Sequence, residues 1–267
     1  MTRVLVIGSS HVAAWRGAAD RFAAERPDLA VDFFGVRGPL FQGGAVGADG
    51  HFTVPLRDDR DRDFVTATNG ATSVDTRPHD RLVMVGHRFD FPVVLALLVD
   101  HDVLERPRTG APRLIGEALL RDTIEATVVA SVGEAARAVA AFDGHVVFAP
   151  APYPARSILE RGDDYPLARM LRAFWSRPDA DAIAGLWRDR VAAEMQRHGH
   201  ALLVQPAALC DGPYATPARF AARAAALDGA LGITDHRHMN ADFGLAMLDA
   251  FAQNHLGVAP RPTERIA

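Results

Sequence analysis

Two short polar segments, far apart in the sequence, carry the residue types that acyl transfer needs. The first, residues 8–11, reads Gly-Ser-Ser-His and follows an apolar run, and the second, residues 234–240, holds an aspartate and a histidine three positions apart. A histidine that takes the proton of a serine activates the hydroxyl as a nucleophile, and a carboxylate orients the imidazole and stabilises its charged form. In this interpretation a serine of the first segment, Ser9 or Ser10, is the nucleophile, His238 the general base and Asp235 the partner of the histidine.

Both segments also allow other interpretations. A serine between a strand and a helix is a preferred helix cap, so Ser9 or Ser10 would then have a structural role only. Asp235, His236 and His238 are residue types that bind zinc, which would place them in a metal-dependent hydrolase. Against this, a paired motif such as His-Glu-x-x-His is missing from the rest of the chain.

The elements that must position these segments follow from the apolar pattern. Short apolar runs predict five strands, and the stretches between them have helical spacing. The expected strands are residues 4–7, 30–34, 81–85, 146–149 and 201–204; the expected helices are 11–26, 91–104, 113–142, 167–198 (interrupted near Pro178), 216–229 and a last one from 240 or 241. This alternation predicts an α/β protein with three α/β/α layers and a mainly parallel five-stranded sheet.

The domain organisation follows from the same pattern. Residues 42–80 have little periodicity, so we expect short strands, turns and an irregular excursion there. Residues 1–258 are expected to form a single domain and residues 259–267 a flexible tail. In open α/β sheets, ligands bind at the carboxyl ends of the strands, which is where Ser10 falls. The N–H groups of the helix that follows favour negative charge there.

Composition excludes several classes of function. The formal net charge is −4 and all 29 basic residues are arginine, which argues against a general nucleic-acid partner. The Gly-x-Gly-x-x-Gly fingerprint is missing and the chain has no lysine for a P-loop, so no cofactor is expected. Cys210 is the single cysteine. Between Met1-Thr2-Arg3 and Gly8 there are only four apolar residues, too few for the hydrophobic region of a signal peptide. With no apolar run near the ~18 residues of a membrane span, we expect a cytoplasmic protein with no membrane partner.

The two segments together resemble the first and last motifs of the SGNH, or GDSL-like, hydrolase superfamily. In that family a Gly-Asp-Ser motif ends the first strand, and an Asp-x-x-His motif lies shortly before the last helix. The His-x-Asn sequence and the Phe243-Gly244 pair that follows it also recur in bacterial members. The resemblance implies a flavodoxin-like sheet, Ser10, His238 and Asp235 as the triad, and transfer of an acyl group to water or to another hydroxyl. Ser9 stands where the family has aspartate.

The resemblance also implies an oxyanion hole, and here this sequence departs from the family. A glycine after the second strand supplies one backbone donor, which Gly38, or else Gly35, would provide. The asparagine that the family has after the third strand is missing, and the segment after Gly86 has His87 and Arg88 instead. Either side chain can donate a hydrogen bond to an oxyanion. Arg88 could alternatively bind an anionic substrate group or pair with Asp90.

The remaining expected contacts lie on loops near the same edge. Tyr153 and Arg156 follow the proline-rich end of the fourth strand and are expected to contact substrate, although a surface loop explains them equally well. Asn240 would either contact substrate or cap the last helix. The sequence thus predicts a serine esterase or O-acyltransferase that acts on a small-molecule or carbohydrate ester. The alternatives are a catalytically altered, glycan- or ligand-binding protein of the same fold and the metal-dependent hydrolase.

Overall fold

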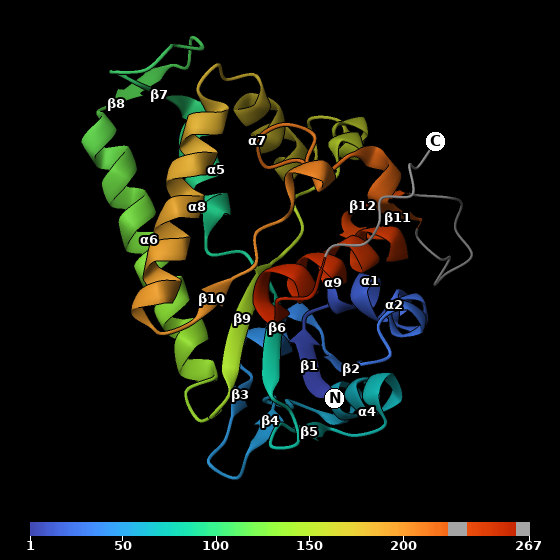
Figure 1. Ribbon diagram of the computed structural model, residues 1–267. Coiled ribbons are helices and arrows are strands. Elements are labelled where there is room, and N and C mark those ends of the chain that lie inside the picture. Colours follow the sequence, from blue (N-terminus) through green and yellow to red (C-terminus); the bar gives the residue numbers. More distant parts are fainter. Residues whose placement is uncertain (224–233, 260–267) are drawn as a thin grey trace.

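A five-stranded parallel sheet forms the centre of the protein in a computed structural model, which describes residues 1–223 and 234–259 (Figure 1). Its strands lie in the order β10-β9-β6-β1-β2, and every neighbouring pair is parallel. They are β1 (Thr2–Gly8), β2 (Leu29–Gly35), β6 (Arg81–His87), β9 (His145–Pro150) and β10 (Ala201–Leu202). The expected α/β class and sheet are confirmed, and the strand order reverses between β1 and β6. Such a switch point is where doubly wound sheets bind ligands.

The two faces of the sheet carry separate apolar cores, because successive side chains of a strand point to opposite faces. Leu5 and Ile7 of β1 pack against one helical layer, and Val4 and Val6 against the other. The first layer contains α5 (Phe91–Asp100), α6 (Glu117–Ala138), α7 (Pro166–Trp175) and α8 (Ala180–Arg197), and the second α1 (Val12–Gly17), α2 (Ala19–Glu25) and α9 (Ala241–Leu256). Figure 1 shows α5, α6 and α8 on one side of the strands and α1, α2 and α9 on the other.

Smaller elements surround the main sheet. Residues 42–80 contain more regular structure than expected, including an 11-residue helix that Asp58 caps by accepting a hydrogen bond from the Asp61 N–H. This helix was not predicted because only Asp61 and Val65 of it are buried, which leaves no apolar period. The additional elements are α3 (Gly38–Gln42), β3 (Ala45–Val46), β4 (His51–Thr53), α4 (Asp59–Asn69), β5 (Ser73–Asp75), β7 (His101–Val103), β8 (Arg113–Ile115) and the 3₁₀ helices η1 (Arg156–Arg161), η2 (Ala207–Leu209) and η3 (Ala218–Phe220).

A strand pair replaces part of an expected helix near the end of the chain. The described part of 216–229 forms η3 and β11 (Ala221–Arg223), which pairs antiparallel with β12 (Thr234–Met239). The prediction was wrong here because the helix propensity of alanine is weak beside a tertiary strand pairing. Residues 224–229 of the expected helix, and 260–267 of the expected tail, lie outside the described residues. The single-domain assignment stays a prediction.

Close packing of α1 against α9 brings the two polar segments together. A Cβ atom on Gly244 would lie 1.9 Å from the carbonyl oxygen of Ala14, so only glycine allows this approach. Asn240 begins α9, and its side-chain oxygen accepts a hydrogen bond from the Phe243 N–H. Since Ser10 precedes α1 and His238 precedes α9, this contact sets the two residues beside one another.

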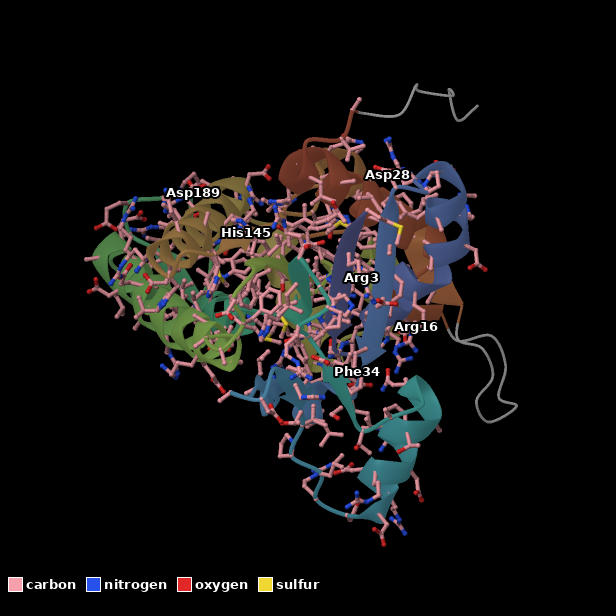
Figure 2. The ribbon with its side chains drawn as sticks, turned by 60° about the horizontal axis from the view of Figure 1, so that its bottom comes forward. Arg3, Arg16, Asp28, Phe34, His145 and Asp189 are labelled. Carbon is pink, nitrogen blue, oxygen red and sulfur yellow. The ribbon has the colours of Figure 1, made fainter. Side chains whose placement is uncertain are left out.

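Arg16 fastens α1 to the neighbouring edge of the sheet. Its guanidinium donates to the carbonyl oxygens of Thr68 and Phe33 and to the side-chain oxygen of Asn69. Arg16 is labelled in Figure 2. The same asparagine bonds both backbone groups of Gly35. These bonds hold α1 and the end of α4 against the carboxyl end of β2, next to the serine turn.

Candidate active site

Ser10 lies on the turn between β1 and α1 and faces His238. Its Oγ is 2.6 Å from His238 Nε2. It does not cap α1, which begins after His11 without a side-chain cap. Ser9 is buried, and its Oγ packs against Gly86. A Cβ atom added to Gly86 would lie only 2.2 Å from this Oγ. The serine that meets the histidine is therefore Ser10, not Ser9.

Asp235 holds the other side of the His238 ring. Its Oδ2 lies 2.5 Å from His238 Nδ1, and its Oδ1 accepts hydrogen bonds from the backbone N–H groups of Arg237 and His238. The hydrogen bond from His238 is the largest of the effects that hold the pKa of Asp235 far below its usual range. An ionised Asp235 only accepts, so Nδ1 of the histidine carries the proton and Nε2 is free to accept one from Ser10.

The three candidate zinc ligands of the metal-dependent alternative, Asp235, His236 and His238, do not converge. His236 lies one position from Asp235 on β12 and points the other way, where its Nδ1 is 2.9 Å from Ser157 Oγ. Within residues 1–223 and 234–259, no three His, Cys, Asp or Glu side chains are grouped to hold a metal ion. This geometry does not support the metal-dependent alternative.

A cavity of about 580 Å³ opens beside Ser10 and His238. It lies at the carboxyl ends of β1 and β6 and is closed by α3, α6 and the segment before α9. Its volume is in the range of small-molecule sites. The polar residues that line it are Ser9, Ser10, His11, Gln42, His87, Arg88, Asp90, Ser131, Glu134, Arg237 and His238.

Gly38 lies at the rim of this cavity, at the first position of α3. The residue before it, Arg37, is extended, and a Cβ on Gly38 would meet nothing within 4 Å. The first N–H groups of a helix have no acceptor within the helix, so they can bind a developing negative charge. Gly35 is a poorer donor because its N–H already binds Asn69. Gly38 is therefore the better candidate of the two glycines, and its assignment as an oxyanion donor stays a prediction.

A proline at position 38 tests this donor, because proline lacks the N–H and is tolerated at the first turn of a helix. The Gly38→Ala variant is the matched control, since it adds a Cβ beside Pro39 but keeps the N–H. We expect Gly38→Pro to lower kcat for ester hydrolysis about 100- to 1000-fold relative to Gly38→Ala. Equal kcat values for the two variants, with similar melting temperatures, would remove Gly38 from the oxyanion hole.

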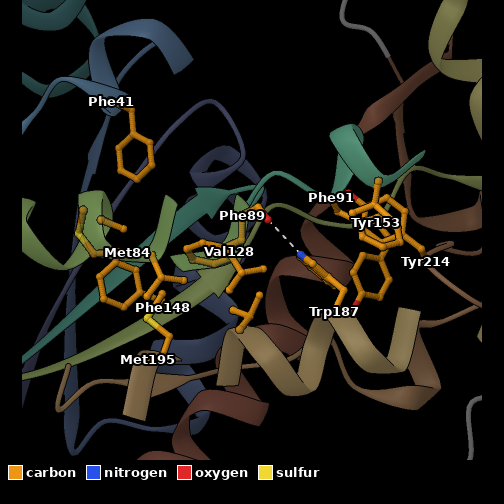
Figure 3. Close-up of a cluster of buried hydrophobic side chains, with 14 of the residues drawn as sticks. Phe41, Met84, Phe89, Phe91, Val128, Phe148, Tyr153, Trp187, Met195 and Tyr214 are labelled. Carbon is orange, nitrogen blue, oxygen red and sulfur yellow. Dashed lines mark hydrogen bonds between the residues drawn. The ribbon is translucent and has the colours of Figure 1, made fainter. Parts of the chain in front are cut away.

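His87 lines the cavity with a ring that is packed among aromatic side chains. The centroid of its ring lies 4.6 Å from that of Phe41, 5.5 Å from Phe89 and 5.6 Å from Phe148, which are labelled in Figure 3. Its Nε2 has no hydrogen-bond partner among the described residues, and burial lowers the pKa of the imidazole to about 4. His87 is therefore neutral near pH 7 and keeps one N–H. Its role as an oxyanion donor stays a prediction.

Burial of a neutral His87 makes stability depend on pH. Above its ordinary pKa of about 6.5 the imidazole is neutral in both the folded and the unfolded chain; below it only the unfolded chain binds the proton. We expect the free energy of unfolding to fall by about 3 kcal/mol from this group as the pH drops from about 6.5 to about 4. Urea denaturation at several pH values should show a shallower dependence in His87→Leu. Parallel curves for the two proteins would contradict a buried neutral imidazole.

Arg88 contacts His11, whose ring lies beside that of His238. The Nη2 of Arg88 is 3.4 Å from His11 Nε2, and no ion pair joins Arg88 to Asp90 in the described part of the chain. The rings of His11 and His238 are 4.9 Å apart between centroids. Burial lowers the pKa of Arg88 and, as the largest of several effects, lowers that of His11 well below its usual value. His11 is thus an uncharged acceptor for Arg88.

The three expected substrate contacts do not line the cavity. Tyr153 is buried, with its ring 4.7 Å from that of Tyr214 between centroids (Figure 3). Arg156 lies over the ring of Trp175 and within 3.8 Å of Asp211. Asn240 uses its side-chain oxygen to cap α9 and its Nδ2 to bind the carbonyl of Arg219. The expectation fails because each side chain is already committed to local packing or hydrogen bonds.

Several lining residues were not predicted. His11 and Arg237 are sequence neighbours of Ser10 and His238, so their position was a usable signal. Glu134 comes from α6, more than a hundred residues from either segment, and only the packing of α6 beside the sheet brings it to the cavity.

No protein-family model matches the sequence, and no curated protein matches it.

Solved structures with a similar fold include the following three. The periplasmic domain of a lipopolysaccharide acetyltransferase from Salmonella ser. Paratyphi A is 12% identical with a TM-score of 0.39, covering 95% of this chain and 83% of that one. A G-D-S-L family lipolytic protein from Desulfitobacterium hafniense is 10% identical with a TM-score of 0.41, covering 95% and 99%. An extracellular lipase from Streptomyces rimosus is 13% identical with a TM-score of 0.40, covering 94% and 99%. The name of the second of these proteins refers to the G-D-S-L family, whose motifs the two segments of this sequence resemble.

Proposed function

We propose that the protein is an SGNH-type serine esterase or O-acyltransferase. The observation that carries this proposal is the hydrogen-bonded chain from Ser10 through His238 to Asp235, at the mouth of a cavity of small-molecule size. Nucleophile, base and orienting carboxylate have the mutual geometry that acyl transfer requires. The proposal does not depend on the similar solved structures.

The reaction proceeds in two halves. Ser10 Oγ attacks the acyl carbon of the ester while His238 Nε2 takes its proton. The imidazolium, stabilised by Asp235, then gives this proton to the departing alkoxide, which leaves Ser10 acylated. In the second half a water or hydroxyl attacks the acyl-serine as His238 takes its proton, and the proton returns to Ser10 as the serine leaves. Water as acceptor gives an esterase, and another hydroxyl gives an O-acyltransferase.

The negative charge that develops on the acyl oxygen needs donors on the side of Ser10 away from His238. The N–H groups of Ser10 and Gly38 are assigned to it, with the remaining N–H of the neutral His87 as the third donor in place of an amide side chain. A polar lining that includes Gln42, Ser131 and Glu134 suits a hydroxyl-rich, carbohydrate-like ester.

Rapid mixing of the purified protein with p-nitrophenyl acetate tests this function. We expect a burst of p-nitrophenol equal to the enzyme concentration, or at least steady turnover, together with an acetylated Ser10 peptide after acid quenching. Addition of a polyol such as glycerol separates the two outcomes of the second half, since transfer yields an acetylated polyol. No turnover and no acetylated peptide, from a protein with a cooperative melting transition, would overturn the proposal.

A further inference from the structure

We propose that the substrate of this site carries an anionic group, a carboxylate or a phosphate, which Arg88 binds inside the cavity with Arg237 beside it. This inference rests on the proposed acyl-transfer function of the same site and names its substrate class. It assigns Arg88 to substrate binding instead of to the oxyanion hole.

Arg88 has no counter-charge among the described residues. In residues 1–223 and 234–259, no carboxylate lies within the 4.0 Å of an ion pair from its guanidinium, whose one side-chain partner is His11. Arg88 is half-buried, whereas the fully buried Arg177 binds both Asp102 and Asp179. Burying a cation without a partner is costly, so a site that keeps one gains when a ligand brings an anion.

The loop that carries Arg88 has a strained backbone. Gly86 has a φ of +112°, and the non-glycine residues Phe89 and Asp90 have φ values of +43° and +54°. The Phe89 side chain is buried, and its carbonyl oxygen accepts a hydrogen bond of 3.0 Å from Trp187 Nε1, the dashed line in Figure 3. Positive φ at two successive non-glycine residues costs free energy and is typical of positions where a site is built. The backbone on both sides of Arg88 is therefore held in a defined conformation.

The cavity is lined by charged side chains of both signs. Arg88 and Arg237 both lie close enough to His11 to lower its pKa further, so positive charge gathers at the Ser10 end. Asp90 and Glu134 also line the cavity; burial raises the pKa of Asp90, and the negative charge of Glu134 raises it further. Neither carboxylate pairs with Arg88. The cavity therefore offers cationic groups near His11, the neighbour of Ser10, for an anionic substrate group, and carboxylates that can accept hydrogen bonds from substrate hydroxyls.

Three aryl acetates with the same acyl group test the inference: 4-acetoxybenzoate, 4-acetoxyphenyl phosphate and the neutral methyl 4-acetoxybenzoate. We expect the wild type to have a kcat/KM at least about 10-fold higher for one or both anions than for the methyl ester. Arg88→Met should lower kcat/KM for the preferred anion about 10- to 100-fold more than for the methyl ester. Which anion is preferred distinguishes a carboxylate from a phosphate substrate.

Arg81→Met is the matched control, because Arg81 lies at the opposite end of β6 and its guanidinium binds the Asp80 carbonyl. It removes one positive charge without touching the cavity, so the preference for anions should persist. Equal losses for all three esters in Arg88→Met would mean that Arg88 acts on the oxyanion and would overturn the inference. An absent preference in the wild type would overturn it as well.

A binding measurement separates this inference from the proposed function. Calorimetric titration of Ser10→Ala with benzoate and with inorganic phosphate is expected to show binding that Ser10→Ala/Arg88→Met loses, with both proteins checked by thermal melting. Anion binding without any ester turnover by the wild type would keep the anion site and reject the esterase. Turnover of the methyl ester without anion binding or preference would keep the esterase and reject the anion site.

Discussion

Ser10→Ala is expected to lower kcat for ester hydrolysis at least about 1000-fold, because no other group can form the acyl intermediate. The backbone donors and the cavity remain, so a small activity over the uncatalysed reaction is expected to persist. The measurement is the initial rate of p-nitrophenol release at saturating ester, with the spontaneous rate subtracted.

Ser9→Ala is the matched control for this variant. Ser9 is adjacent in sequence, but its buried Oγ has no hydrogen-bond partner among the described residues, so its removal leaves no polar group unpaired. We expect kcat/KM of Ser9→Ala to stay within about 3-fold of the wild type, a free-energy change below about 1 kcal/mol. If Ser9→Ala abolished hydrolysis and Ser10→Ala did not, the nucleophile would be misassigned.

Asp235→Asn is expected to cost about 10⁴-fold in kcat, the loss seen when the same change is made in a serine protease triad. The asparagine keeps the shape of the side chain but can present an N–H to His238 Nδ1. The ring would then carry its proton on Nε2, where it cannot accept the proton of Ser10. Asp242→Asn is the control, since Asp242 lies seven residues later on α9 and its contact is with Arg21 at the surface.

The pH dependence of the remaining activity gives a second readout for Asp235→Asn. If Asp235→Asn holds His238 in the wrong tautomer, kcat is low across the neutral pH range and the protein keeps its melting transition. Simple unfolding would abolish the melting transition as well. Wild-type kcat in Asp235→Asn, with a folded protein, would show that the carboxylate neither orients nor stabilises the histidine.

The sheet was predictable from the sequence because its strands are buried on both faces. Val4 to Ile7 and Val146 to Ala149 read as unbroken apolar runs for this reason. β12 was not predictable, since its sequence Thr-Asp-His-Arg-His-Met is polar and its partner β11 lies in an alanine-rich stretch. Strand pairing between such segments is decided by tertiary contact and leaves no periodic signal.

The candidate site, too, could be predicted from the sequence only in part. Ser10, Asp235 and His238 lie together as predicted, because the two short motifs, in this order on this strand pattern, resemble those of one family. The cavity wall was not predicted, because Glu134 reaches it only through the packing of α6. Tyr153 and Arg156 follow a strand at the correct edge, but the ring of Tyr153 turns into the core against Tyr214, and Arg156 is held by Trp175. Position along the chain predicted the edge of the sheet, and side-chain packing decided which residues face the cavity.

The most direct test of the proposed triad is the position of covalent labelling by a fluorophosphonate, an electrophile that reacts with an activated serine. Peptide mass spectrometry of the labelled wild type should place the adduct on Ser10, and the labelling should disappear in Asp235→Asn far more than in Asp242→Asn. An adduct on a different residue, or an unlabelled Ser10 in a folded protein beside a control esterase that reacts normally, would contradict the proposed Ser10-His238-Asp235 mechanism.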